Sequence, residues 1–233
     1  MAGHSHAGVF GVLGTADLTG KLQKLPCGFH GFYGRTLDDW LILLDHSAGA
    51  DVFYFWNGNQ HLSAFLFQAS PTFDFHLSSL PKEPVLKCDQ ILPEEALREF
   101  FGHGNEWLLD LLGRQKDIDG CRRFVCGTPP PKGNDQKLRV WVSREPAFVQ
   151  RAERLGVSLD DAPFSPLQLR KKMWSLVQDL LKEAASKMGA RFIPVPSEAF
   201  NSEGCLDKKF WMTDATHANG EYGRLWVQRI MSL

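Results

Sequence analysis

The sequence predicts an α/β fold with a parallel β-sheet, and two observations carry this prediction. Segments with helical periodicity alternate with short apolar runs along most of the 233 residues. This alternation is typical of folds in which helices connect parallel strands. The run 51–56 (Asp-Val-Phe-Tyr-Phe-Trp) is almost wholly apolar, as expected of a strand that is covered on both faces.

Length and composition favour a single globular domain that spans residues 1–233, with a possible insertion around 133–166. No linker is visible, and 43% apolar with 23% charged residues is enough to build a core. The formal net charge of −1 argues against a protein that binds nucleic acid or an anionic membrane, since such proteins present a basic face. We expect neither partner.

The cysteines and the chain start favour a soluble, cytoplasmic protein. Five cysteines are widely spaced without a Cys-x-x-Cys pair, which indicates free thiols in a reducing compartment. The first residues lack a basic start followed by an apolar run, and no apolar run reaches membrane-spanning length.

The first half of the chain predicts two turns, one helix and one strand. Glycine-rich stretches at 3–14 and 26–35 suit tight turns where backbone approaches a ligand. Thr36 is a good N-cap for a helix that ends near 47–50. The strand 51–56 then leads into the polar loop 57–61. That loop follows the strand's carboxyl end, where ligands bind in open α/β sheets.

The second half predicts three helices and two strands. After an irregular segment over 70–90, we expect a helix from Pro93 to Leu112 that is weakened by two internal glycines. Further elements are a strand at 122–126, a long helix at 167–188, a strand at 191–195 and a closing helix at 222–231. On the long helix, the basic residues are expected on the solvated side; these are Arg170, Lys171, Lys172, Lys182 and Lys187.

The candidate chemistry centres on Asp214 and His217, three residues apart. At this spacing the carboxylate can accept a hydrogen bond from the imidazole Nδ1–H, which leaves Nε2 free to act as a base. Ser5, in a glycine-flanked turn, is the candidate nucleophile. Gly34 offers a backbone N–H and Asn59 a side-chain amide for an oxyanion hole.

Taken in chain order, these residues resemble the four blocks that define the SGNH (GDSL-type) hydrolases. The matching segments are Gly3-His4-Ser5-His6, Gly31-Phe32-Tyr33-Gly34-Arg35-Thr36, Asn57-Gly58-Asn59-Gln60-His61 and Asp214-Ala215-Thr216-His217. The resemblance covers nearly the whole chain. It departs from the family at His4 and Gln60, where the family has aspartates.

The resemblance implies a three-layer α/β/α sandwich with a flavodoxin-like, mostly parallel sheet. It also implies hydrolysis of an ester or acyl group through an acyl-serine intermediate, without cofactor or metal. Ser5 would be the nucleophile, His217 the base and Asp214 its orienting partner. The N–H groups of Ser5 and Gly34 and the Asn59 amide would bind the oxyanion. Tyr33 and His61 are candidate contacts to a small-molecule or carbohydrate ester.

Three other interpretations remain open at this stage. The same fold could serve as a non-catalytic carbohydrate-binding or scaffold domain. An O-acyltransferase could use the same serine, with an alcohol in place of water. The pair His4 and His6 could hold the metal of a metal-dependent hydrolase, although the spacing of the other histidines fits no such pattern. The sequence decides neither the substrate nor the oligomeric state.

Overall fold

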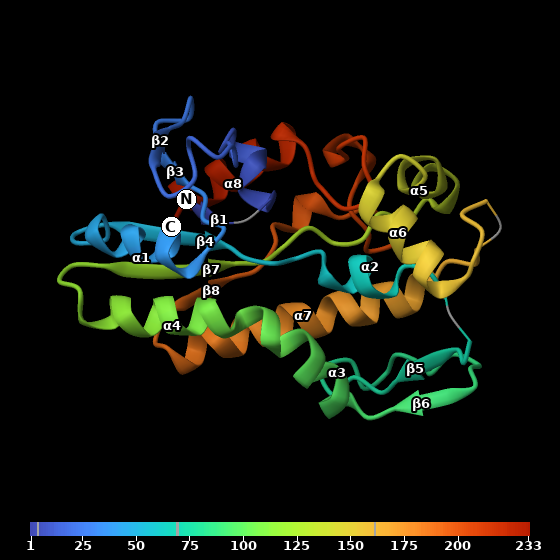
Figure 1. Ribbon diagram of the computed structural model, residues 1–233. Coiled ribbons are helices and arrows are strands. Elements are labelled where there is room, and N and C mark those ends of the chain that lie inside the picture. Colours follow the sequence, from blue (N-terminus) through green and yellow to red (C-terminus); the bar gives the residue numbers. More distant parts are fainter. Residues whose placement is uncertain (4, 69, 161) are drawn as a thin grey trace.

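The computed structural model describes residues 1–3, 5–68, 70–160 and 162–233, and of Ser5 only the backbone. Its centre is a six-stranded sheet in the order β2-β3-β1-β4-β7-β8 (Figure 1). The strands are β1 Ala2–Gly3, β2 Leu22–Lys24, β3 His30–Phe32, β4 Asp51–Phe55, β7 Arg122–Cys126 and β8 Arg191–Ile193.

Five of these strands are parallel, and only the edge strand β2 pairs antiparallel, with β3. Numbered along the chain, the parallel strands lie in the order 2-1-3-4-5. That is the flavodoxin-like order. The parallel sheet and its flavodoxin-like topology are therefore confirmed.

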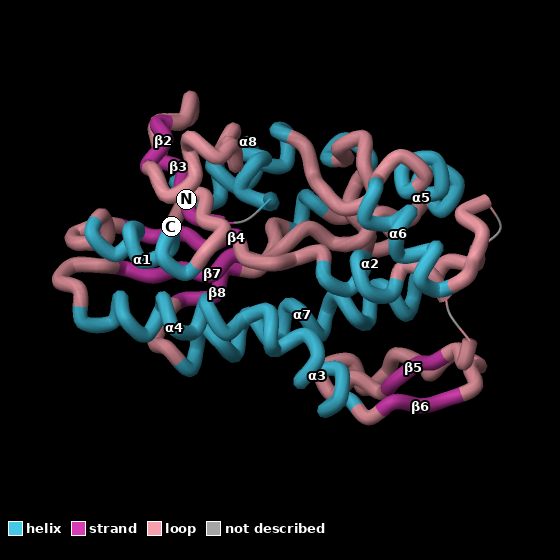
Figure 2. The backbone as a smooth tube through the Cα atoms, in the orientation of Figure 1, coloured by secondary structure: helices cyan, strands magenta, loops and turns pink. Residues whose placement is uncertain are grey.

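Helices cover both faces of the sheet, which gives the expected three layers (Figures 1 and 2). On one face α1 (Leu37–Asp45), α4 (Glu106–Arg114) and α7 (Leu167–Lys187) pack on the sheet through a shared apolar core. On the other face a second core joins the sheet to the 3-10 helix η1 (Ser5–Phe10) and to α8 (Gly220–Met231). Gly223 of α8 approaches η1 so closely that a Cβ there would lie 2.1 Å from the Val9 carbonyl oxygen.

Local signals place several elements where the sequence predicts them. Thr36 caps α1 as expected and forms a capping box with Asp39. The Thr36 side chain accepts from the Asp39 N–H, and the Asp39 carboxylate accepts from the Thr36 N–H. The helix expected over 93–112 is present but divided. It forms α3 (Glu94–Gly102), the 3-10 turn η2 (His103–Asn105) and α4, so the break falls at the glycines that weaken helical backbone.

Several segments hold more regular structure than the sequence indicates. Strand β3 lies within the glycine-rich stretch 26–35, and α2 (Gln60–Phe65) begins within the polar loop 57–61. The excursion after residue 70 contains β5 (Phe73–Phe75) and β6 (Gln90–Leu92), which pair in parallel as a separate small sheet. The segment 133–166 contains α5 (Asp135–Val142) and α6 (Pro146–Leu155). The remaining short elements are η3 Gln115–Asp117, η4 Ser197–Ala199 and η5 Lys208–Phe210.

The prediction that the basic residues of α7 lie on its solvated side is wrong for two of them. Arg170 and Lys172 are 0% and 3% exposed. The Lys172 Nζ lies 2.8 Å from both carboxylate oxygens of Asp74, which is itself fully buried within β5. The partner of Lys172 lies 98 residues away, and Arg170 binds the Lys132 carbonyl and Asp135 from 38 and 35 residues away. Helical periodicity reveals none of these partners.

Replacement of Lys172 by methionine is expected to lower the free energy of unfolding by about 3–5 kcal/mol, because Asp74 would keep a buried charge without its counter-ion. Urea denaturation followed by circular dichroism measures the change. Lys182→Met is the matched control, since Lys182 is exposed on the same helix and surface changes usually stay within about 0.5 kcal/mol. Equal unfolding midpoints for the two variants would contradict the prediction.

The five cysteines are free thiols. Within the described ranges, no helix is long and apolar enough to cross a membrane.

Candidate active site

The candidate residues of the first three blocks all follow strands at their carboxyl ends. Ser5 opens η1 directly after β1, Gly34 lies two residues after β3, and Asn59 follows β4. The sheet order reverses between β1 and β4, and in open α/β sheets this switch point is where ligands bind. The fold therefore brings these three segments, far apart in sequence, to one edge of the sheet.

Asp214 and His217 lie in a closed loop that precedes α8. The bridge between Trp211 and Ala218 pairs the two ends of the loop. Asn219 reinforces this closure, since its amide donates to the Lys209 and Trp211 carbonyls while its oxygen caps α8. The loop is thus held at its base by backbone and capping interactions.

Asp214 both shapes the turn and orients the histidine. Its Oδ1 accepts hydrogen bonds from the backbone N–H groups of Thr216 (3.0 Å) and His217 (2.7 Å). Its Oδ2 lies 2.9 Å from His217 Nδ1. An ionised carboxylate only accepts, so this contact assigns the proton to Nδ1 and leaves Nε2 as an acceptor.

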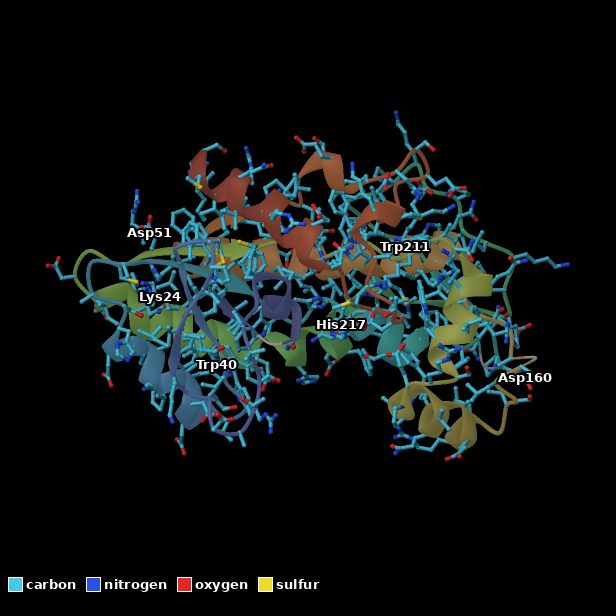
Figure 3. All side chains as sticks on the ribbon, turned by 90° about the horizontal axis from the view of Figure 1, so that it is seen from above. Lys24, Trp40, Asp51, Asp160, Trp211 and His217 are labelled. Carbon is cyan, nitrogen blue, oxygen red and sulfur yellow. The ribbon has the colours of Figure 1, made fainter. Side chains whose placement is uncertain are left out.

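The Nε2 of His217 is buried and has no hydrogen-bond partner in the part of the chain that the structure describes. The His217 ring lies beside that of His6, with ring centroids 5.4 Å apart. His6 is the residue after Ser5 in η1, so the candidate base His217 lies at the start of the helix that carries the candidate nucleophile. In Figure 3, His217 lies near the middle of the molecule, between Trp40 and Trp211.

The local electrostatics keep Asp214 ionised. Burial opposes its charge, but the hydrogen bonds from His217 and the electrostatic attraction of His217 and Lys132 outweigh burial and lower the pKa of Asp214 to about 2. The carboxylate can therefore stabilise an imidazolium at His217 at any pH where the protein is expected to work.

The two further oxyanion candidates occupy tightly packed loops. A Cβ on Gly34 would lie 2.7 Å from the Trp40 ring, so only glycine fits there. Asn59 stands at the N-cap of α2, yet its side chain makes no capping bond. The nearby Asn57 amide, in contrast, donates to the Gly104 carbonyl at 2.7 Å. Of these two asparagines, Asn59 is the one whose side chain makes neither a capping bond to α2 nor the hydrogen bond to the Gly104 carbonyl.

The two candidate substrate contacts differ in accessibility. Tyr33 is half-buried, and its ring packs against Gly14. His61 is 1% exposed within α2. Burial, together with the positive charge of Arg170, lowers the pKa of His61 to about 3, so its ring is neutral. In this conformation a solute outside the protein does not reach His61, and its role as a substrate contact stays a prediction.

Sequence reasoning missed two residues that hold the loop containing Asp214 and His217. The buried Lys132 Nζ contacts the carbonyl oxygens of Met212 (2.9 Å) and Asp214 (2.5 Å). The Glu145 Oε1 accepts a hydrogen bond of 2.7 Å from the Ala215 N–H. A signal for Lys132 was available, because it closely follows β7 at the same carboxyl edge as the other candidates.

The segment 133–166 supports this loop. Residues of α5 and α6 share one apolar cluster with α2 and with Ala215, the residue after Asp214. Trp141 of α5 also packs edge-to-face on Trp211, with ring centroids 5.8 Å apart. Whether the segment also contacts substrate, as expected for an insertion, stays a prediction.

Among the described residues, no group of three or more His, Cys, Asp or Glu side chains is placed to hold a metal ion. His4, half of the candidate metal pair, lies outside the described residues. The side chain of the candidate nucleophile Ser5 lies outside them as well.

Comparison of the sequence with models of known families and with well-described proteins gives no match. Among solved structures, the chain is similar to a Bacteroides fragilis protein whose crystal structure is named only provisionally as that of an acylhydrolase. The two share 15% sequence identity with a TM-score of 0.47, over 99% of this chain and 83% of that one. At that level of similarity the comparison carries no conclusion about the activity of this chain.

Proposed function

We propose that this protein is a serine hydrolase of the SGNH type that cleaves an ester or acyl group through an acyl-serine intermediate. The supporting observation is the pairing of His217 with Asp214. The carboxylate holds Nδ1, and the opposite nitrogen, Nε2, has no partner among the described residues and lies beside the start of η1. This is the arrangement that a base for a serine hydroxyl requires.

In the proposed reaction, the Ser5 Oγ attacks the carbonyl carbon of the substrate while His217 Nε2 takes the hydroxyl proton. The carbonyl oxygen becomes an oxyanion, bound by the N–H groups of Ser5 and Gly34 and by the Asn59 amide. His217 then gives its proton to the departing alcohol as the C–O bond breaks. Water, deprotonated by the same Nε2, hydrolyses the acyl-serine and restores Ser5.

The proposed substrates are small-molecule esters, with acetyl esters of carbohydrates as the favoured class. The half-buried Tyr33 ring, on the loop that also carries Gly34, offers a surface on which a sugar ring can stack.

A fluorophosphonate probe tests the proposal, because it phosphonylates only a serine that a base has activated. Intact-mass spectrometry after incubation is expected to give one adduct on the wild type and none on Ser5→Ala. The control is Ser63→Ala, which removes an exposed serine of α2 and should be labelled like the wild type.

A folded wild type that stays unlabelled would remove the support for an activated serine. An adduct that persists on Ser5→Ala would assign the nucleophile to another residue. Hydrolysis of p-nitrophenyl acetate by the same samples then reports whether labelling and turnover depend on the same serine.

A further inference from the structure

Lys132 is a buried cation that has no part in the proposed reaction. It follows β7 by six residues, and its side chain is 1% exposed. Besides the two carbonyl contacts to the loop, its Nζ lies 3.5 Å from Asp214 Oδ1 and 4.7 Å from the centroid of the Trp141 ring. A lysine is rarely buried so completely unless its charge has a specific partner.

The partners of Lys132 and Glu145 belong to one peptide group. Lys132 binds the carbonyl oxygen of Asp214, and Glu145 accepts from the N–H of Ala215, which is the other end of the same peptide bond. Because the peptide group is planar, hydrogen bonds to both its carbonyl oxygen and its N–H fix its orientation. The Cα of Asp214 belongs to this planar unit, so the point from which its side chain leaves the backbone is fixed as well.

We propose that Lys132 is a positioning residue that, together with Glu145, locks the Asp214–Ala215 peptide and so holds the Asp214 carboxylate against His217 Nδ1. The inference rests on the proposed function for its effect on activity, but its effect on the loop is independent of that function. Lys132 acts through Asp214 and contacts no reacting atom.

The surroundings of Lys132 make its hydrogen bonding to the loop depend on pH. The Nζ faces Asp214 of the loop, Glu145 at the start of α6 and the Trp141 ring of α5, while Arg170 of α7 donates to the Lys132 carbonyl at 3.3 Å. Burial lowers the pKa of Lys132 to about 8, although the charges of Asp214 and Glu145 act in the opposite direction. Below that pH the ammonium carries three N–H donors. Above it the neutral amine holds the carbonyls more weakly.

The experiment compares the wild type with Lys132→Met, which keeps the length of the side chain without its charge, and with Lys132→Arg, which keeps the charge at every pH. With p-nitrophenyl acetate we expect Lys132→Met to lose about 10²-fold in kcat with KM unchanged, because the base is displaced rather than removed. Rates of fluorophosphonate labelling should fall in parallel.

The pH profile separates positioning from a merely structural role. In the wild type, kcat is expected to fall as the pH rises through about 8. In Lys132→Arg this alkaline fall should move to higher pH, since arginine stays protonated. A fall at the same pH in both proteins overturns the proposal, and this comparison does not require Lys132→Met to fold.

Hydrogen exchange of residues 211–218 provides a readout without activity. Lys132→Met should exchange faster there than the wild type, whereas Lys137→Met should not, because the exposed Lys137 lies over the Trp211 ring, 5.7 Å from its centroid, and has no hydrogen bond from its ammonium to the loop among the described residues. Unchanged exchange in Lys132→Met overturns the inference. If exchange rises while the wild type shows no labelling or turnover, the inference stands and the proposed function fails.

Discussion

Replacement of His217 by alanine is expected to lower kcat for ester hydrolysis by about 10⁴–10⁶-fold, the range seen when a member of a catalytic triad is removed. The variant lacks the buried Nε2 that would accept the serine proton in the proposed reaction, whereas the loop keeps its closure through Asn219 and the Trp211–Ala218 bridge. Steady-state hydrolysis of p-nitrophenyl acetate, corrected for the spontaneous rate, measures the loss.

Two comparisons show whether the lost function is that of a base. Added imidazole should restore part of the rate in His217→Ala, because a small base can occupy the vacated volume beside Asp214. His46→Ala, which changes an exposed histidine at the end of α1, should behave as the wild type. A His217→Ala protein that retains more than about a hundredth of the wild-type kcat would contradict a general-base role.

Replacement of Asp214 by asparagine is expected to lower kcat by about 10⁴-fold while the fold is retained. The asparagine oxygen can still accept the two backbone N–H groups that Oδ1 accepts now. Its NH₂ group, however, would then face His217 Nδ1 and require that nitrogen to be an acceptor. The ring proton would move to Nε2, and the histidine could no longer take a proton from the serine.

This loss should be independent of pH between about 5 and 7, because the pKa of Asp214 is lowered to about 2 and its wild-type carboxylate is ionised throughout, while Lys132, with a pKa of about 8, keeps its charge. Rate profiles of both proteins over that range, with circular dichroism to verify folding, make the comparison. An Asp214→Asn variant whose activity recovers toward the wild-type value as the pH rises within that range would indicate that the carboxylate does not select the tautomer.

The sequence alone carried enough information for the layout of the fold. The apolar run at 51–56, the Thr36 cap and the helical periodicity of 167–188 all correspond to the elements β4, α1 and α7. These features are local, since capping and periodicity depend on residues within a turn or two of each other. The contact between Asp214 and His217 is predictable for the same reason, because it spans three residues.

Tertiary structure alone decided which residues support that pair. Lys132 and Glu145 bind the loop from 82 and 70 residues away along the chain. Lys132 comes from the segment after β7, and Glu145 from the start of α6, which shares an apolar cluster with Ala215. The same holds for Lys172, whose partner Asp74 lies 98 residues away. Periodicity predicted Lys172 on the solvated face of α7. The sequence of one helix does not distinguish a lysine that a distant carboxylate will pair with from a lysine that water will hydrate. The difference arises only when another segment supplies the carboxylate and removes the water.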